Sequence, residues 1–420
     1  MAKSHRHLGA LLTVAALVTS LAGCRRPESF QGTLVLWEPP RWPVAGDTSR
    51  WTRDRAAAFE QAHPGIKVEF QSYPEADLEG ALDKAWKAGQ GPDVALAPFR
   101  PDWARDGRLQ VLDALLPTDV QKDLIPGTLD ATRLNGKLYG LPAGAEPSLL
   151  VLNLDAFAAR GVTPPAAGRW TQDEFEKTLK ALSGKVGDRN VYSLGYYVLP
   201  GFYEFWPLWT AGEPLLDPAT GSLQPDREPI RQAIARLGSW TREPGLLWPG
   251  SARRGPEDLW QAFVGPEASV AMAPWGSWAL PLLRQGKFQS HVAVAHFPSV
   301  GGRSATTGVV RTYLLRAQTD NLKAQAALDL ALFLTDPTAQ KEQARNTGIL
   351  PVRRSAGNPF PEDAALSQAL DLVPEMVPLP ADKARREAMD QLQQRVQYAV
   401  LGALTPEQAV GGGGKPHATP

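Results

Sequence analysis

The sequence predicts an α/β protein with two strand-and-helix blocks, on the evidence of its length and of two kinds of hydrophobic spacing. The chain has 420 residues, which is too long for one compact core and indicates two or three domains. Short apolar runs of strand length alternate with longer stretches of helical spacing. This alternation is typical of a parallel sheet that is covered by helices.

The first block alternates strands with helices. Its predicted strands are short apolar or alternating runs, and they cover Thr33–Trp37, Ile66–Phe70, Asp93–Ala97 and Leu149–Leu152. Its predicted helices carry apolar residues on one side and end at Gly or Pro, and they cover Asp47–Ala62 and Leu78–Ala88. The tripeptide Asn135-Gly136-Lys137 indicates a turn.

The second block begins with a helix through Leu182 that Thr171 caps, because Glu174 completes a capping box. Strands are predicted over Tyr192–Val198, Ser269–Ala273, His291–Phe297 and Thr306–Leu315. Helices are predicted over Pro229–Thr241, Glu257–Val264 and Trp275–Arg284. The remainder is mainly helical, over Leu322–Thr335, Pro337–Arg345, Ala365–Leu372 and Ala381–Leu404.

The composition excludes several classes of protein. Lys and Arg number 44 and Asp and Glu number 44, so the net charge is zero, whereas a nucleic-acid binder carries a strong basic excess. A single Cys can form neither an internal disulfide nor a thiolate zinc site. The unusual feature of the composition is its tryptophan content, because the chain has 13 Trp and only 8 Tyr.

The first residues are predicted to export the chain. Lys3 and Arg6 form a positive region, Leu8–Ala16 is apolar, and small residues follow, which is the pattern of a signal peptide. The segment ends Leu21-Ala22-Gly23-Cys24 and resembles a bacterial lipobox, in which cleavage leaves a lipidated N-terminal Cys. The alternative is an ordinary signal peptide with a chance Cys, but Cys24 is the only Cys of the chain.

Nine stretches of the chain match a known family in the family's own order. They are TLVLW, AAAFEQAHPGIKVEF, GQGPDVALAP, GRLQVLD, NGKLYGLPAGAEPSLLVLN, WTQDEFEKTLKAL, FVGPEASVAMAPWGSW, ALDLALFLTDPTAQ and GILPVR. The sequence thereby resembles bacterial extracellular solute-binding proteins of the sugar-binding type, which are the substrate-capturing lipoproteins of ABC importers. The resemblance runs from about Thr33 to Val410.

The resemblance implies a fold of the periplasmic-binding-protein kind, with two discontinuous α/β lobes around a central cleft and hinge. A signal peptide would cover residues 1–23, and the lipidated Cys and a linker 24–32. The first lobe would comprise 33–146 and 304–350, and the second 147–303 with the C-terminal helices in 351–410. Residues 411–420 would form a flexible tail.

The same resemblance implies capture of a small solute, a sugar or oligosaccharide, outside the cytoplasm. The partners would be membrane permease subunits, and the protein would be a monomer with no cofactor or metal. The sequence leaves open a non-sugar solute, anionic or polyol, and a catalytic or sensory lipoprotein on the same scaffold. It contains no His-Glu-x-x-His, glycine-rich phosphate loop or Gly-x-Ser-x-Gly motif.

Candidate ligand contacts lie where strands end or where the chain crosses between lobes, since such ends face the crevice of open α/β sheets. Aromatic faces cover the C–H patches of sugars, and polar groups bind the hydroxyls. The candidates are Trp37, Glu38, Phe99, Arg100, Glu146, Tyr203, Trp206, Trp275 and Arg311. Glu146, Tyr203 and Trp206 match contact positions of sugar-binding relatives.

Several of these candidates have a structural alternative. Trp37 is either a core or a cleft residue. Glu146 either contacts the ligand or is a hinge residue that packs or pairs with Arg. Arg311 lies in an apolar strand and needs either an acidic partner or an anionic or hydroxyl ligand group, because an unpaired buried charge is costly. Trp275 is expected to stack on a sugar, with Trp278 as its core partner.

The chain departs from maltose-binding relatives at two places. Ala97-Pro98 replaces the aromatic and small residues found there in those relatives. Near the start of the last long helix, where they place a stacking Trp, this chain has Arg385 and Arg386. A specificity for maltose is therefore not implied.

Overall fold

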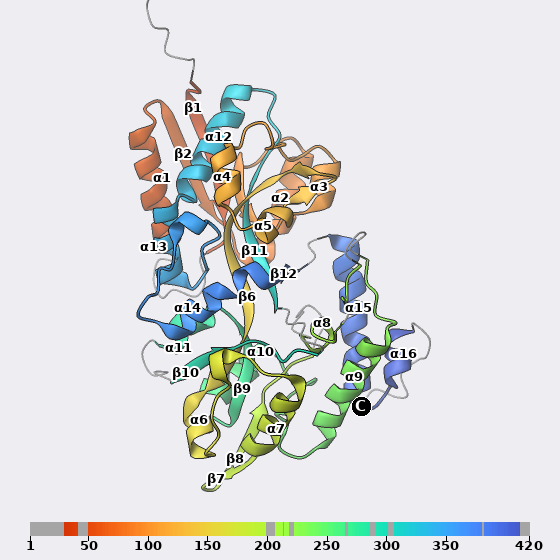
Figure 1. The fold of residues 1–420 in the computed structure, drawn as a ribbon. Coiled ribbons are helices and arrows are strands. Elements are labelled where there is room, and N and C mark those ends of the chain that lie inside the picture. The colour runs from red at the N-terminus through yellow and green to blue at the C-terminus, as the bar shows by residue number, and fades with distance from the viewer. Residues whose placement is uncertain are drawn as a thin grey trace, which may run out of the picture.

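The computed structural model describes residues 29–40, 49–198, 206–212, 214–217, 222–264, 268–284, 291–300, 306–379 and 382–411 (Figure 1). Two lobes lie one above the other in the figure, and strands β6 and β11 run between them. The predicted two-lobe α/β architecture is therefore confirmed. The positions of the lobe boundaries stay a prediction, and Cys24 and Tyr203 lie outside the described residues.

The strands are β1 Gly32–Glu38, β2 Ile66–Ser72, β3 Val94–Ala97, β4 Arg133–Leu134, β5 Lys137–Leu138, β6 Gly140–Asn153, β7 Gly184–Val186, β8 Arg189–Leu194, β9 Val270–Gly276, β10 Val292–Ala295, β11 Thr306–Leu315 and β12 Met376–Pro378. The longer helices are α1 Arg50–Ala62, α2 Glu75–Lys87, α7 Gln172–Leu182, α9 Glu228–Arg242, α10 Pro256–Val264, α12 Asn321–Leu334, α13 Pro337–Thr347, α14 Ala364–Asp371 and α15 Lys383–Val400. The shorter ones are α3 Pro101–Arg105, α4 Thr118–Asp123, α5 Pro126–Asp130, α6 Leu154–Ala159, α8 Trp206–Trp209, α11 Ala279–Leu283 and α16 Pro406–Val410.

The main sheet is continuous through both lobes, in the order β2-β1-β3-β11-β6-β9-β8-β7. Strand β1 is parallel to β2 and β3, as the alternation of strands and helices predicts, and β8 is parallel to β9. The two central strands are different, because β11 is antiparallel to β3 and β6, and β6 is antiparallel to β9. The sheet is therefore parallel over β2, β1 and β3 and between β8 and β9, and antiparallel around the two strands that join the lobes and at the β7 edge.

Strand β6 is the longest described strand, with 14 residues, and only Leu149–Leu152 in its second half was predicted. The missed half contains Gly and Pro, which are normally unfavourable in strands. The two glycines of this part, Gly140 and Gly144, permit close packing. A Cβ at Gly140 would lie 2.4 Å from Thr312 Cγ2, and one at Gly144 would lie 2.4 Å from Ile349 Cγ2.

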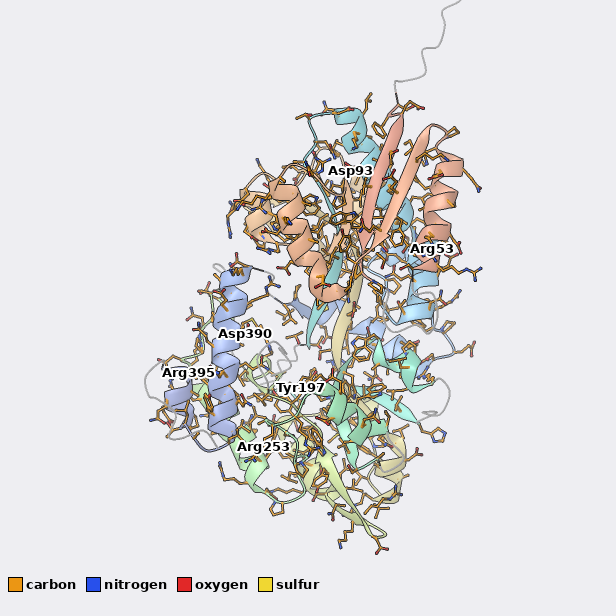
Figure 2. All side chains as sticks on the ribbon, turned by 180° about the vertical axis from the view of Figure 1, so that it is seen from behind. Arg53, Asp93, Tyr197, Arg253, Asp390 and Arg395 are labelled. Carbon is orange, nitrogen blue, oxygen red and sulfur yellow. The ribbon has the colours of Figure 1, made fainter. Side chains whose placement is uncertain are left out.

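A buried carboxylate anchors the first lobe. Asp93 is 1% exposed and accepts hydrogen bonds from the Val35 backbone N–H at 3.0 Å and from Arg316 at 2.9 Å. Lys323 Nζ lies 2.9 Å from the same carboxylate. Because a buried charge needs partners, this network explains the Asp of the GQGPDVALAP stretch as a structural residue (Figure 2).

The end of β9 corrects one predicted boundary. The sequence predicts a helix from Trp275, but β9 continues to Gly276 and α11 begins at Ala279. Trp275 is therefore a strand residue, and its side chain enters the interior with 3% of its surface exposed. By contrast, the capping box of Thr171 and Glu174 at the start of α7 is confirmed.

Candidate ligand-binding site

An ion-paired cluster lies on the two strands that join the lobes. Arg311 of β11 donates from Nε to Glu146 Oε1 of β6 at 2.5 Å and from Nη1 to Glu75 Oε1 of α2 at 2.7 Å. Burial alone lowers the pKa of Arg311, but attraction by Glu146 and Glu75 outweighs burial and raises it. Two predicted site residues, Glu146 and Arg311, are therefore in direct contact.

This contact bears on the alternatives left open for Arg311 and Glu146. Arg311 was expected to need either an acidic partner or a ligand group, and it has the acidic partner. Glu146 was expected either to contact the ligand or to pair with an Arg, and it pairs with an Arg. Glu146 still has capacity for a ligand, because within the described parts of the chain its Oε2 accepts no hydrogen bond. A carboxylate oxygen with free lone pairs can accept a hydroxyl.

The end of β1 places its two candidates on opposite faces of the strand, as alternation requires. Glu38 is 0% exposed and accepts hydrogen bonds from Thr52 Oγ1 at 2.7 Å and from the Tyr313 hydroxyl. Its carboxylate therefore lies in the interior of the first lobe. Trp37 is half-buried, and its ring centroid lies 4.4 Å from that of Tyr73, a residue the sequence reasoning missed although it directly follows β2.

The two candidates after β3, Phe99 and Arg100, also make contacts with other side chains of the protein. Phe99 is buried and stacks on Tyr139 with centroids 6.2 Å apart. Arg100 donates to Asp102 Oδ1 at 2.9 Å and to Glu79 Oε1 at 2.7 Å. Burial lowers the pKa of Arg100, but these acids outweigh burial and raise it.

A second ion-paired cluster connects helix α15, which packs on α9 in the second lobe, to the first lobe. Arg386 of α15 donates from Nη2 to Glu79 Oε1 at 2.6 Å and from Nη1 to Glu79 Oε2 at 3.0 Å. Such a two-point pair fixes geometry as well as charge. Arg105 Nη1 adds a contact to Asp382 at 3.4 Å. Figure 1 shows the start of α15 reaching α2 and α3.

Helix α2 connects the two clusters. Glu75 and Glu79 are four residues apart, so they lie one above the other on one helix face, separated by about 6 Å along the axis. Glu75 binds Arg311 of β11, whereas Glu79 binds Arg100 and Arg386. Arg386 therefore pairs with Glu79 of the first lobe. In the sequence, Arg386 stood out only as a difference from the maltose-binding relatives.

The second lobe contributes an aromatic cluster around Trp275. The centroid of Trp260 lies 5.1 Å from that of Trp275, and those of Trp278, Phe263 and Tyr197 lie 6.3, 6.4 and 6.5 Å away. Trp278 is half-buried and Trp275 is buried, so the expected order of exposure is reversed. The reason is the longer β9, which directs Trp275 inward.

Trp275 lies beside the crossing point of the lobes. In the register of β6 and β9, Trp275 pairs with Leu149, three residues after Glu146. Its buried Nε1–H has no hydrogen-bond acceptor among the described residues. Figure 2 shows Tyr197, also missed by the sequence reasoning, on the part of the second lobe nearest the first.

The remaining candidates lie near α8. Trp206 is the first residue of α8, and the structure describes its backbone only. Trp209 at the end of α8 is 4% exposed, as expected for a core residue. No cluster of metal-ligating side chains occurs in the described parts of the chain, and no helix there is long and apolar enough to cross a membrane.

Comparisons with known proteins identify the class to which this fold and site belong. The family model described as bacterial extracellular solute-binding protein matches residues 54–368, well over half of the chain. The chain belongs to this family of exported solute-binding proteins, and the resemblance seen in the sequence is confirmed.

Individual relatives are distant but mostly of similar length. The galactooligosaccharide-binding protein of Bacillus subtilis is 25% identical over 97% of this chain and 96% of its own. An uncharacterized lipoprotein of Streptomyces antibioticus is 28% identical over 41% of this chain and 39% of its own. The solved structure of the sugar-binding protein MalE from Xanthomonas citri superposes with a TM-score of 0.75 at 20% identity, covering 90% and 95% of the two chains.

Proposed function

We propose that this solute-binding protein captures a carbohydrate at the junction of its lobes and delivers it unchanged to an ABC importer. The observation that carries the proposal is Trp275, an indole buried beside the lobe crossing whose N–H finds no acceptor among the described residues. An unpaired buried donor costs about 1–3 kcal/mol, and a sugar hydroxyl would satisfy it. Oligosaccharide binding by the Bacillus relative supports the same ligand class.

The charges of the junction support a neutral ligand. Arg311, Arg100 and Arg386 are each paired with protein carboxylates, so none is reserved for an anion. Breaking a buried pair to bind an anion would be costly. Hydroxyls can instead use the free oxygen of Glu146 and the indole of Trp275.

A carbohydrate screen tests this function. Thermal shift against maltooligosaccharides, galactooligosaccharides, monosaccharides, polyols and glycerol phosphates should show stabilisation by a sugar, about 2.7 kcal/mol at 100 times its dissociation constant. Chromatography after incubation should recover the sugar intact. Stabilisation by glycerol phosphate alone would assign an anionic ligand, and a cleaved sugar would support the catalytic alternative.

We also propose that Cys24 carries a lipid anchor. The lipobox pattern and the similarity to a Streptomyces lipoprotein support it. Cys24→Ala should abolish labelling by a radioactive fatty acid and release the protein from membranes, whereas Cys24-containing protein stays bound. A processed mutant that stays in the membrane fraction would exclude this anchor.

A further inference from the structure

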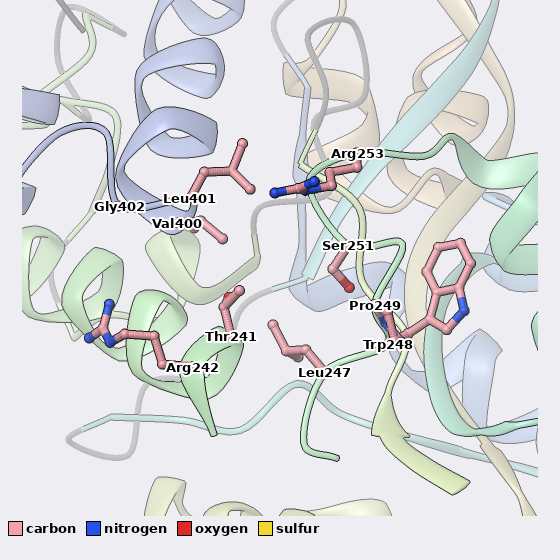
Figure 3. Close-up of a pocket in the computed structure, with 10 residues that line it drawn as sticks. All are labelled: Thr241, Arg242, Leu247, Trp248, Pro249, Ser251, Arg253, Val400, Leu401 and Gly402. Atoms are coloured by element: carbon pink, nitrogen blue, oxygen red, sulfur yellow. The ribbon is translucent and has the colours of Figure 1, made fainter. Parts of the chain in front are cut away.

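A separate cavity of about 340 Å³ lies in the second lobe, where helices α9 and α15 end against the segment 247–253 (Figure 3). Its lining residues are Thr241, Arg242, Leu247, Trp248, Pro249, Ser251, Arg253, Val400, Leu401 and Gly402. None of them is acidic. The cavity is at the small end of the range of ligand pockets.

This cavity is remote from the junction described above. Arg386 lies near the beginning of α15 and Leu401 directly after its end. The helix has 18 residues, which span about 27 Å at 1.5 Å per residue. A ligand in this cavity would therefore not touch the ion pairs around Glu79.

Two polar side chains of the 247–253 segment have no partner in the structure. Ser251 is 5% exposed, and its buried Oγ makes no hydrogen bond within the described chain. The guanidinium of the exposed Arg253 makes no ion pair or hydrogen bond with the described residues either. In Figure 3 the Arg253 guanidinium extends across the cavity toward Leu401.

The other guanidinium near the cavity is placed differently. The Arg242 side chain folds back along α9, where its Nη1 would lie 3.2 Å from a Cβ built at Gly238. Figure 3 shows this guanidinium pointing away from Ser251. A cation at a helix C-terminus is favourable by itself, so Arg242 needs no ligand to explain it.

The segment that presents Ser251 and Arg253 is held in place by the backbone. Ala252 between them has φ 62°, a left-handed conformation that costs a non-glycine residue about 1–3 kcal/mol. Its carbonyl accepts a hydrogen bond from Gln397 Nε2 of α15 at 2.7 Å. The Arg253 N–H bonds to the Gly250 carbonyl at 3.0 Å. The two side chains are therefore presented by a constrained turn.

We propose that this cavity binds a small organic anion, with a carboxylate or phosphate group next to an apolar part. The Arg253 guanidinium would form a charge-assisted pair with the anionic group, and the Ser251 hydroxyl would donate to it. The apolar part would contact Leu247, Val400 and Leu401. The carbonyl ends of α9 and α15 repel negative charge, so the Arg253 guanidinium, and not these helix ends, would hold the anionic group.

Calorimetry with phenyl phosphate and phenylacetate tests the proposal, with benzyl alcohol as the uncharged probe. We expect both anions to bind and benzyl alcohol not to bind. Arg253→Gln should weaken the anions at least tenfold, or about 1.4 kcal/mol. Ser251→Ala should weaken them less. Arg242→Gln is the matched control and should bind as wild type.

Each other outcome overturns the proposal. Equal loss in Arg242→Gln and Arg253→Gln would indicate nonspecific charge attraction. Undiminished binding in Arg253→Gln, or no binding of either anion at millimolar concentration, would exclude the site. Because Arg253 is exposed, its variant should keep the wild-type melting temperature, which circular dichroism checks.

Discussion

The two lobes present different chemistry to their junction. The first lobe offers charged groups that already have partners, namely Arg100 with Glu79 and Arg311 with Glu75. The second lobe offers the aromatic cluster around Trp275, whose indole N–H has no acceptor in the part of the chain that the structure describes. Ion pairs with fixed geometry specify how two parts of the protein are arranged, whereas aromatic faces supply contact area for a ligand.

This difference suggests a division of labour between the lobes. The charged groups fix how the first lobe meets the hinge and helix α15, and the aromatic groups hold the ligand. If that is correct, changes on the charged side should alter stability or lobe arrangement first. Changes on the aromatic side should alter ligand affinity first.

The largest effect is expected for Arg311→Met, which removes the cation between Glu146 and Glu75. The variant leaves the carboxylate of Glu146, with a side chain only 11% exposed, without its partner. Breaking such a buried pair costs about 3–5 kcal/mol. Urea unfolding should show this loss, and the double variant with Glu146→Gln should recover much of it. A loss below about 1 kcal/mol would mean that solvent already screens the pair.

A smaller effect is expected for Trp275→Phe, and it should appear in ligand affinity. The substitution keeps an aromatic ring and deletes the unpaired indole N–H, so the melting temperature should stay near that of wild type. Losing one hydrogen bond to the ligand costs about 0.5–1.5 kcal/mol, or about two- to thirteenfold in affinity. Calorimetry with the sugar found in the screen measures it.

The matched control for Trp275→Phe is Trp278→Phe, which changes a half-buried neighbour in the same cluster. The affinity of this variant for the sugar should stay within about twofold of wild type, which corresponds to a change in binding free energy of less than about 0.4 kcal/mol. Equal losses in both variants would show that the cluster acts as a packed unit. Trp275 would then have no special contact.

Local sequence signals predicted most of the fold. The strand over Thr306–Leu315 has the predicted bounds, and the Thr171 capping box is present as expected. Periodicity and capping are local properties, so a single sequence reveals them. The first part of β6 was missed because it contains Gly and Pro, and its glycines pack closely against β11 and residue 349, which no local pattern shows.

The site was less predictable, because its contacts join distant segments. The need of Arg311 for an acidic partner followed from its apolar strand, but Glu75 lies 236 residues away in the sequence. The role of Arg386 required knowledge that α15 reaches α2. Glu38 was placed at a strand end, yet strand alternation directs it into the core, where Thr52 binds it.

The smallest effect is expected for the bridge between Glu79 and Arg386, which tests whether charge sets the lobe arrangement. Burial raises the pKa of Glu79, but Arg386 and Arg100 outweigh burial and lower it. A lowered folded-state pKa stabilises the folded state above the unfolded value of 4.5, and that contribution is lost as pH falls through the folded value. The bridge should therefore be intact at neutral pH and weaken only in acid.

Arg386→Gln should remove this bridge with a loss of stability of about 1 kcal/mol or less, because both side chains are partly exposed. Small-angle scattering of the ligand-free variant at pH 7 should show a larger radius of gyration than wild type, since α15 no longer holds the first lobe. Lys383→Gln, on the same helix, is the control and should leave the radius unchanged. An unchanged radius in Arg386→Gln would show that packing of the strands β6 and β11 alone sets the lobe arrangement.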